Sequence, residues 1–525
     1  MFFMLDQAPP YHEVATVGQP AQTESRASAA TKVARQEVSS HGYHYIVVGN
    51  HLLSKAEVNA ALDSGDTPRA AMGALKKAYE RKGYFLVALV ARVNSDKQVW
   101  LEVVQGRLTH IEGPSKSAAY FNALKGNDKV KNSDVIRDSI LLQAYDATNG
   151  QKPQISFRPA PEVGGSTMQI SQTPVPDAHW YGGSLTLGNF GNRYAGHYLA
   201  QAQASAQYDG FTLQLSHSRA LAGMSEDTRG AFYDANTAEL SAVTPLGIFQ
   251  IDGSDTRYAL GDAFAPLYPA GHIKVFGGSM TQLLYADDTQ RWSLKEGLHH
   301  IRDTGTVFSG DYVLRDQKYD VIDFGTDYSQ RFGGLFQHPA ALSLSSDLKL
   351  GAARGDSGFV HARGAPVGHF QILTASANVT QSLAHSYSLQ FSLSGQVTPD
   401  VLPSYQQWVL GGLNNLTAWL PGTIVGDRGY LARVTAQAPQ WSLGPLRFRP
   451  SLFAEYGASR YTYIPVNTPT WQALDDVGAS LSLGLPIAHT SAVLAYAKPV
   501  GAQNVAQKLR DGQRSHLFFY LQAAF

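Results

Sequence analysis

The stretch Tyr198 to Tyr208, YLAQAQASAQY, alternates strictly between two kinds of side chain. Its even-numbered positions are Tyr or Ala, and its odd-numbered positions are Leu, Gln or Ser. Because successive side chains of a β-strand point to opposite faces, this period of two indicates a strand with one apolar face and one polar, mostly uncharged face. The same alternation returns in three later stretches, Tyr387 to Thr398, Val477 to Leu485 and Leu517 to Phe525.

A soluble β-sandwich also alternates in this way, but three features favour a membrane β-barrel. The polar face is rich in Gln, Ser and Thr, as expected of a water-filled lumen. Aromatic residues such as Tyr198 and Tyr208 stand at strand ends, where the aromatic girdles of barrels form. Tight and long connections alternate along the chain, and the long ones are expected around 222–232, 258–271, 303–318 and 353–367.

Sixteen alternating runs follow His179. They are expected to begin near residues 180, 197, 211, 233, 248, 272, 291, 321, 340, 369, 387, 430, 446, 476, 490 and 516. An even count suits a bacterial outer-membrane barrel, and about 16 strands enclose a bore wide enough for water. The predicted fold class is therefore a set of α+β domains followed by a 16-stranded antiparallel transmembrane β-barrel.

The composition narrows the class of protein further. The 525 residues are enough for several domains, and the balance of 42 basic and 42 acidic residues predicts no nucleic-acid partner. The chain has no cysteine, which fits an oxidising compartment, although cytosolic proteins can lack cysteine too. The longest apolar run, Phe85 to Ala91, is far shorter than the ~20 residues of a membrane-spanning helix.

The first residues do not form a good signal peptide, because no basic segment precedes Met1 to Leu5 and Asp6 ends the apolar run. The chain is therefore expected to be mature or truncated, or else not exported. Residues 1–41 are expected to be an N-terminal extension and linker, with a helix over about 24–36.

Between residues 42 and 176, helical and strand patterns mix and recur. In the first part, Ser54 and Glu57 form a capping box at the start of a helix. The expected order there is strand, two helices and two strands, over 43–48, 54–62, 67–81, 85–93 and 99–104. The order recurs over 107–111, 118–124, 133–145, 154–158 and 167–172. A duplicated small α+β unit is predicted, with its copies at 42–106 and 107–176.

One connection of the expected barrel is unusually long. LGGLNNLTAWLPGTIVGDRGYLARVTAQ, from Leu410 to Gln437, joins the eleventh strand to the twelfth through an uncharged loop that ends in Gly-Asp-Arg-Gly. Its apolar side chains need a place to pack, and they are Leu416, Trp419, Leu420 and Ile424.

Taken together, the chain resembles the two-partner secretion transporters. These are the TpsB family, or ShlB/FhaC/HecB-type haemolysin secretion/activation proteins, of the BamA-type outer-membrane superfamily of Gram-negative bacteria. YHYIVVGN, AYERKGYFLVALV and VWLEVVQGRLTHIEG resemble the first POTRA domain of that family, and residues 114–174 resemble the second more loosely. The resemblance implies POTRA domains at 42–106 and 107–176 and a barrel at 177–525 with an in-folded loop at 410–429. It also implies that the expected helix over about 24–36 plugs the pore.

In that family the sixth extracellular loop folds back into the lumen, and its tip usually reads Val-Arg-Gly-Phe or Val-Arg-Gly-Tyr. Here the tip aligns with Leu416, Thr417, Ala418 and Trp419, so the family's arginine is replaced by Thr417 and its glycine by Ala418. The base of the loop keeps the family's pattern as Gly426, Asp427, Arg428 and Gly429.

The family's arginine meets an acid on strand thirteen, which aligns with Glu455 in SLFAEYGAS. A carboxylate left unpaired in a dry site would cost several kcal/mol or shift its pKa. We therefore hypothesise that Arg428 or another lumen arginine compensates Glu455, or that Thr417 donates a single hydrogen bond to it.

The last residue is Phe525, and Phe519 and Leu521 share its face. This pattern is either a simple edge strand or the C-terminal signal by which outer-membrane barrels are recognised for assembly, and we favour the signal. The barrel-assembly machinery is then an expected partner during biogenesis, besides the lipid bilayer of the outer membrane.

The resemblance implies that POTRA domains in the periplasm capture a large secreted partner polypeptide of haemolysin or adhesin type, which then crosses the outer membrane through a monomeric barrel. An assembly factor for other barrels is an alternative, although the presence of only two POTRA units and the N-terminal extension argue against it. A passive porin is another alternative, but it has no use for the periplasmic module.

No catalytic, cofactor-binding or metal-binding residue is predicted, and the chain is not expected to be an enzyme. The sequence has no Walker loop, no HExxH and no Gly-x-Ser-x-Gly. His299 and His300 are adjacent in a strand, so they are expected to point to opposite faces. Asp475 and Asp476 are expected on opposite faces as well, at the end of a strand.

Overall fold

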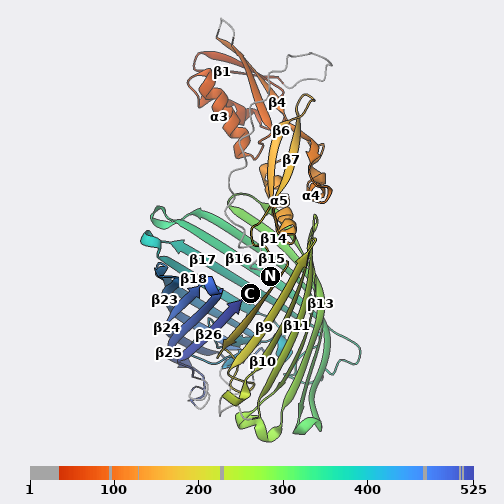
Figure 1. The fold of residues 1–525 in the computed structure, drawn as a ribbon, viewed down its shortest axis with the longest axis vertical. Helices are drawn as coiled ribbons and strands as arrows, with labels where there is room; N and C mark the ends of the chain where they lie inside the picture. Colours follow the sequence, from red (N-terminus) through yellow and green to blue (C-terminus); the bar gives the residue numbers. More distant parts are fainter. Residues whose placement is uncertain are drawn as a thin grey trace. The chain divides into compact units, whose positions relative to one another are not determined.

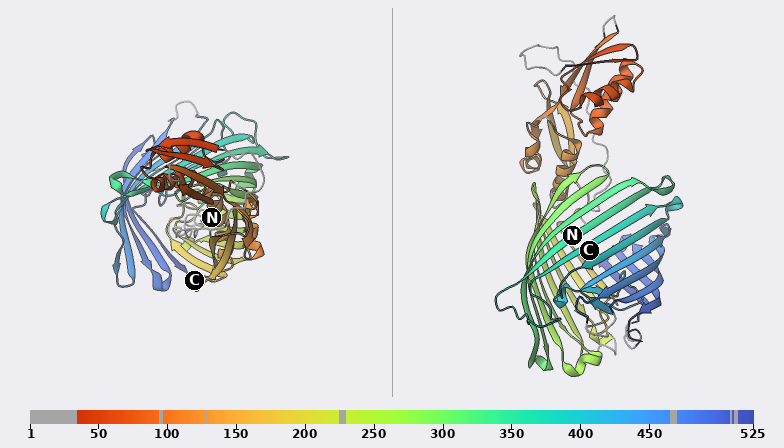
Figure 2. Two further views of the ribbon diagram at one scale, coloured as in Figure 1. Left: turned by 90° about the horizontal axis from the view of Figure 1, so that it is seen from above. Right: turned by 180° about the vertical axis from the view of Figure 1, so that it is seen from behind.

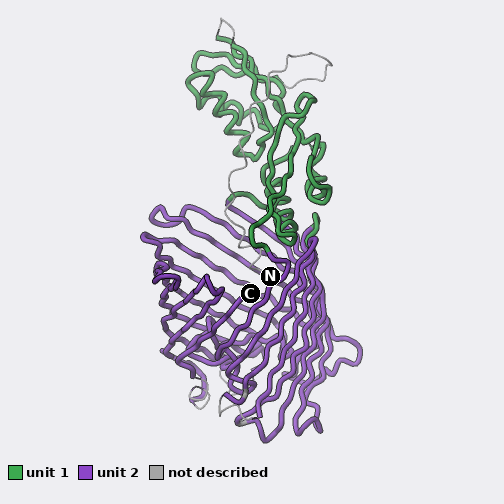
Figure 3. The backbone as a smooth tube through the Cα atoms, viewed as in Figure 1, with its two compact units in different colours: residues 1–178, 243–246, 285–288 green, residues 179–242, 247–284, 289–525 purple. Residues whose placement is uncertain are grey.

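The computed structural model describes residues 35–93, 97–127, 129–224, 230–464, 470–507, 510 and 514–525. Figure 3 shows the chain divided into two compact units. The first comprises residues 1–178 with the short segments 243–246 and 285–288, and the second comprises 179–242, 247–284 and 289–525. Among the helices in the described part of the chain, none is long and apolar enough to cross a membrane.

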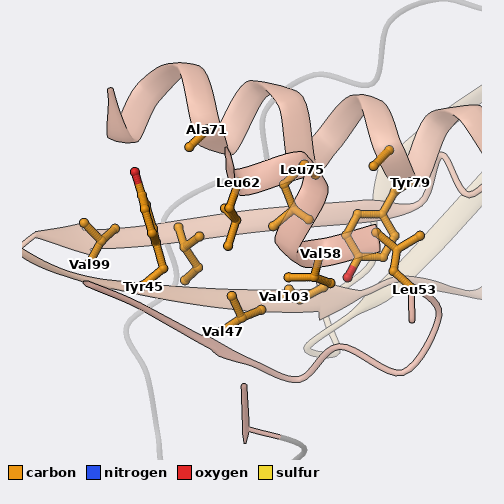
Figure 4. Close-up of a cluster of buried hydrophobic side chains, with 13 residues drawn as sticks. Tyr45, Val47, Leu53, Val58, Leu62, Ala71, Leu75, Tyr79, Val99 and Val103 are labelled. Atoms are coloured by element: carbon orange, nitrogen blue, oxygen red, sulfur yellow. The ribbon is translucent and has the colours of Figure 1, made fainter. Parts of the chain in front are cut away.

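The first domain is a four-stranded sheet in the order β1-β2-β4-β3, in which β2 and β4 run parallel. Its elements are β1 Arg35–Ser40, β2 Tyr43–Val48, α2 Lys55–Asp63, α3 Pro68–Arg81, β3 Val87–Val93 and β4 Gln98–Gln105. Both helices pack on one face of the sheet, where Val58, Leu62 and Leu75 meet Tyr45 and Val99 in a buried apolar cluster (Figure 4).

Helix α2 begins as the sequence predicts. The Ser54 hydroxyl accepts a hydrogen bond from the backbone N–H of Glu57, and the Glu57 carboxylate accepts one from the backbone N–H of Ser54 at 2.8 Å. Lys82 also donates to this carboxylate at 2.8 Å. Hydrogen bonds from Lys82 and Ser54 therefore lower the pKa of Glu57 to about 2, which keeps the carboxylate charged at the positive end of the helix dipole.

The expected boundary of the N-terminal extension at residue 41 is wrong. Strand β1 lies inside that extension and pairs antiparallel with β2, so Arg35 lies opposite Val48 and Ser40 lies opposite Tyr43. The helix expected over 24–36 lies outside the described residues except for Arg35 and Gln36, which belong to β1. Polar residues dominate β1 because it is an edge strand that packs only Val38 against the core.

The second domain repeats the arrangement with a three-stranded sheet in the order β5-β7-β6. Its elements are β5 Arg107–Glu112, α4 Ser115–Ala119, the 3₁₀-helix η1 Asn122–Leu124, α5 Asn132–Ala147, β6 Gln151–Pro159 and β7 Gly165–Pro174. Strands β5 and β7 run parallel, as β2 and β4 do in the first domain. This recurrence of order and strand direction is what a duplicated α+β unit produces.

The remaining chain forms a closed antiparallel barrel (Figures 1 and 2). Its segments are β8 Tyr181–Gly188, β9 Leu199–Tyr208, β10 Phe211–Ala220, β11 Phe232–Thr244, β12 Gly247–Ala259, β13 Ala270–Ala286, β14 Gln290–Val307, β15 Tyr312–Gly333, β16 Pro339–Ala353, β17 Phe370–Ser382, β18 Ser388–Val397, β21 Arg428–Gln437, β22 Trp441–Leu443, β23 Leu446–Arg460, β24 Gln472–Leu485, β25 Thr490–Gln503 and β26 Leu517–Ala524. Because β21 and β22 both pair with β23, they occupy one position in the ring. The predicted fold class, with its sixteen strands, is confirmed.

The alternation that revealed the barrel follows its two surfaces. Ala202, Ala204 and Tyr208 in β9 are exposed on the outer surface, and the Gln and Ser residues between them face the lumen. On neighbouring strands the outward positions hold larger apolar residues such as Leu185 and Leu215. An apolar outer surface around a polar lumen is the arrangement that a lipid environment requires.

The prediction of a long connection at 303–318 is wrong. Strand β14 continues to Val307, and β15 begins at Tyr312 rather than near 321. Charged residues obscured the alternation there, because they pair across the two strands. The Arg302 Nε atom lies 3.0 Å from Asp316 Oδ1, and Arg315 Nε lies 2.9 Å from Asp303 Oδ1.

The core of the first domain gives a direct test of its packing. Leu75 is fully buried beneath helix α3, so Leu75→Ala is expected to lower the free energy of unfolding by roughly 2–5 kcal/mol, through lost apolar contact and a residual cavity. Val93→Ala, at an exposed position of β3, is the matched control and is expected to change it by less than ~0.5 kcal/mol. Urea-induced unfolding of residues 35–106, followed by circular dichroism, measures both. Equal effects would contradict this packing.

Candidate functional site

The long loop between β18 and β21 folds into a small hairpin of its own. Strand β19, Trp408–Leu410, pairs with strand β20, Ile424–Gly426, so that Leu410 lies opposite Ile424. The chain leaves β19 through Gly411, which has a φ of 114°. A Cβ atom at Gly411 would lie 2.1 Å from the carbonyl oxygen of Leu420, so only glycine fits this turn.

The apolar residues of the loop are buried against the barrel wall. Leu416, Trp419 and Ile424 form one cluster with wall residues of β23, β24 and β25, which are Phe453, Leu474 and Ala497. The fourth, Leu420, packs in a neighbouring cluster with Ala495 and Phe518. Trp419 is fully buried, which makes it the largest anchor of the loop. The loop therefore lies inside the barrel, on the wall formed by β23 to β26.

Two glycines allow the loop to approach the wall closely. A Cβ atom on Gly457 of β23 would lie 3.0 Å from Leu416 Cδ1 and 3.1 Å from Leu410 Cδ1. A Cβ atom on Gly429 of β21 would lie 2.0 Å from the Trp408 ring. Side chains at these positions would displace the loop.

Beneath the tip, three ionisable side chains stand in a row on neighbouring strands. Arg433 of β21 lies opposite Glu455 of β23, which in turn lies opposite Asp476 of β24. The Arg433 guanidinium forms a short ion pair with Glu455 and stacks 4.4 Å from the centre of the Phe453 ring. Both carboxylates are almost completely buried. One cation therefore faces two desolvated acids, and further donors are needed.

The loop tip supplies those donors from its backbone. The N–H of Thr417 donates to Glu455 Oε2 at 2.6 Å, and the N–H of Ala418 donates to Asp476 Oδ2 at 2.9 Å. The Thr417 hydroxyl has another role, because it accepts a hydrogen bond from the N–H of Asn414 at 3.2 Å. The tip thus binds two acids with two neutral N–H groups.

This geometry selects among the hypotheses raised by the sequence. The lumen arginine that compensates Glu455 is Arg433, and Thr417 donates through its backbone rather than its side chain. Arg428 is not the partner: it lies at the start of β21, opposite Arg460. Within the described residues its buried Nε atom has no hydrogen-bond partner.

Asp427, at the base of the loop, ties together three segments of the chain. Its carboxylate accepts hydrogen bonds from the N–H groups of Leu402 at 3.0 Å and Thr462 at 2.7 Å. Its backbone carbonyl accepts one from the side chain of Gln396 at 3.0 Å. Gly426 lies against the backbone of Arg460, where a Cβ atom would come within 2.5 Å of the carbonyl oxygen. The Gly-Asp-Arg-Gly stretch therefore fixes where the loop returns to the wall.

Two residues of the site escaped the sequence analysis. Arg433 was not singled out, and Asp476 was expected at a strand end, whereas it is the fifth residue of β24, beside a β-bulge. Alternation within one strand does not reveal which residues of neighbouring strands meet, and only the strand register shows that Arg433 and Asp476 flank Glu455.

The other residues singled out in the sequence lie elsewhere. The hydrogen bonds of His299 and His300 go to Asp323 at 3.0 Å and Asp320 at 2.8 Å, respectively. The C-terminal strand β26, which contains Phe519 and Leu521, closes the ring by pairing with β25 and β8. Phe525 exchanges two backbone hydrogen bonds of 2.9 Å with Gly183. A role of this strand in assembly stays a prediction.

The docking of the tip can be measured by cysteine labelling, because the chain has no cysteine of its own. The thiol of Ala418→Cys, at a fully buried position, is expected to react slowly with a water-soluble maleimide. Arg433→Gln in that background is expected to speed the reaction by more than about tenfold, because breaking a buried ion pair costs roughly 3–5 kcal/mol.

Arg447→Gln, at an exposed arginine of β23, is the charge-matched control and should leave the rate unchanged. The thiol of Asn414→Cys, at an exposed position, should react quickly in every background. Equal labelling of Ala418→Cys with and without Arg433 would show that this arginine does not hold the tip.

Comparisons with known proteins identify the family of the chain. The family described as haemolysin secretion/activation protein ShlB/FhaC/HecB matches residues 164–484, which is more than half of the chain. The heme/hemopexin transporter protein HuxB of Haemophilus influenzae is 24% identical over 351 residues, covering 61% of this chain and 56% of that protein. The match thus spans little more than half the length of this curated relative.

Two solved structures share the fold. CdiB from Escherichia coli matches with a TM-score of 0.74 at 18% identity, and CdiB from Acinetobacter baumannii with 0.67 at 14%. Each match covers 100% of this chain and 95% of the other. The chain belongs to the ShlB/FhaC/HecB family of haemolysin secretion/activation proteins, with its barrel in the outer membrane and its N-terminal domains in the periplasm.

Proposed function

We propose that this protein exports one large, dedicated partner polypeptide across the outer membrane, after its periplasmic POTRA domains have captured the partner. The observation that carries the proposal is the in-folded loop, which occupies the lumen wall through Trp419 and through hydrogen bonds to Glu455 and Asp476. A segment held inside the barrel by a few polar contacts acts as a latch that an arriving chain can displace.

The lumen suits the passage of an unfolded chain. Its wall carries uncharged polar side chains over long stretches, as in β9 and β18, where Gln and Ser alternate with outward apolar residues. These stretches of the wall stay hydrated and offer neither apolar surface nor strong charge to retain a passing polypeptide. The proposal assigns no catalytic step to the protein, which works as a monomer after insertion by the barrel-assembly machinery.

Capture would use the open edges of the POTRA sheets. In the first sheet, β1 and β3 are edge strands, and in the second sheet β5 and β6 are. An extended polypeptide can add to such an edge through backbone hydrogen bonds, with little demand on its sequence. Strand β3 also exposes Val90 and Val93, which offer apolar contact to an added strand.

Quantitative proteomics of the culture medium and the outer membrane, after deletion of the gene, tests the proposal against its rivals. We expect one large protein to disappear from the medium while the levels of other barrels stay constant. A joint fall of many barrels would instead identify an assembly factor. If the protein content of both the medium and the outer membrane stays unchanged, the remaining explanation is a pore that does not export proteins.

The latch is tested by Glu455→Gln. Glutamine keeps an acceptor for the N–H of Thr417 but removes the charge that pairs with Arg433, so we expect export of the partner to fall. The loss of one charge-assisted contact corresponds to roughly 1.5–3 kcal/mol, or about ten- to a hundredfold in loop docking. Secretion is measured by immunoblotting of the medium, with Arg447→Gln as control. Wild-type output from Glu455→Gln would remove Glu455 from the mechanism.

A further inference from the structure

A broad groove lies on the outer surface of the barrel. It has a volume of about 990 Å³ and takes lining residues from β8 to β14, strands that adjoin one another in the ring (Figure 1). Its lining includes Leu185, Leu215 and Phe276, which are among the exposed large apolar residues of the outer surface. The groove therefore opens toward the lipid rather than the lumen.

Small residues between large ones make the floor of the groove. In the strand register Leu215 lies between Ala204 and Ala238, and Gly253 lies opposite Phe276. A Cβ atom on Gly253 would lie in ordinary van der Waals contact with the Val275 carbonyl oxygen at 3.6 Å and the Phe276 ring at 3.7 Å, so Gly253 leaves a shallow depression beside that ring. Because neighbouring strands are ~4.8 Å apart, a groove across seven of them is roughly 30 Å wide. Several acyl chains fit side by side on such a floor.

The extracellular end of the groove is polar and largely basic. The chain enters the barrel from the periplasm at β8, so β10, β12 and β14 run toward the extracellular side. The charged and imidazole residues of the lining stand in the extracellular parts of their strands, and they are His217, Asp255, Lys274, His300 and Arg302. At the extracellular ends of β21 and β23, the outward positions instead hold Tyr430 and Tyr456.

Within the lining of the groove, the two cations Lys274 and Arg302 outnumber the single acid, Asp255. Asp255 is the one carboxylate in the lining, and it contacts Arg257 at 3.2 Å, His272 at 2.9 Å and Lys274 at 3.8 Å. Beside the groove, Arg302 pairs with Asp316 at 3.0 Å. His300 pairs with Asp320 at 2.8 Å, and Arg354 lies 3.8 Å from the same carboxylate. Asp255, Asp316 and Asp320 thus each have at least one Arg or Lys partner, and Asp255 has two, which leaves positive charge for an anionic ligand.

We propose that this groove binds a phosphorylated glycolipid of the outer leaflet that carries several acyl chains. The chains lie on the floor of Ala204, Ala238 and Gly253, between the ridges of Leu215 and Phe276. Lys274 and Arg302 bind the phosphate groups at the extracellular end. The width of the floor favours a lipid with many chains over a two-chain phospholipid, and the site does not depend on the proposed export.

Purified full-length protein in detergent micelles, titrated with hexa-acylated, bis-phosphorylated lipid A and with phosphatidylglycerol, tests the proposal by native mass spectrometry. Lipid A is expected to bind more tightly. The double variant Lys274→Gln/Arg302→Gln is expected to raise the Kd for lipid A by about tenfold or more, because charge-assisted contacts to phosphate are lost. Lys295→Gln/Lys349→Gln, at lumen-facing lysines of β14 and β16, is the matched control and should leave the Kd unchanged.

Ala238→Phe fills the floor without touching the charges, and it keeps the test decisive if the double variant fails to fold. It too is expected to weaken lipid A binding. Unchanged affinity in both variants would overturn the proposal, and so would equal affinity for phosphatidylglycerol. If the protein does not bind lipid A but forms dimers, and if Ala238→Phe abolishes these dimers, the groove would instead be the binding site of a second copy of the chain.

Discussion

Every backbone N–H and C=O group that faces lipid must find a partner within the protein, because the bilayer core offers no water. In this chain the requirement is met by closing the sheet, and the closure is the pairing of β26 with β8, where Tyr520 lies opposite Gly188 and Ala524 lies opposite Ser184. The exchange of hydrogen bonds between Phe525 and Gly183 extends this seam. The lumen, and everything inside it, exists only because these two distant strands meet.

Closure also determines the chemistry of the site. Once the ring is formed, side chains that alternate toward the lumen share a common interior, and residues distant in the sequence become neighbours. Arg433, Glu455 and Asp476 form a row because three strands align in register. The apolar surface of the loop is then buried on a wall whose other face contacts lipid. One face of these strands thus contacts lipid, and the other face contacts the lumen and the loop.

Much of this arrangement could be predicted from the sequence, because a period of two is a local signal. The starts of most barrel strands, the capping box at Ser54 and the long loop after β18 all depend on residues close together in the chain. Strand β1 was missed because an edge strand has few apolar residues. The continuation of β14 to Val307 and the early start of β15 at Tyr312 were missed, because charged residues that pair across the two strands interrupt the alternation. The pairing of Arg433 with Glu455 was beyond reach, since it depends on a register between separate strands.

The position of the ion pair has a consequence for the energetics of opening. In the pattern that the family resemblance implied, the loop would carry the cation and leave an acid behind whenever it moved. Here both Arg433 and Glu455 belong to the wall, and residues 411–425 contain no charged side chain. Moving an elementary charge through a membrane potential costs about 2.3 kcal/mol per 100 mV, but this segment carries none. Its release therefore moves no charged side chain through the membrane, and a voltage does no work on residues 411–425 themselves.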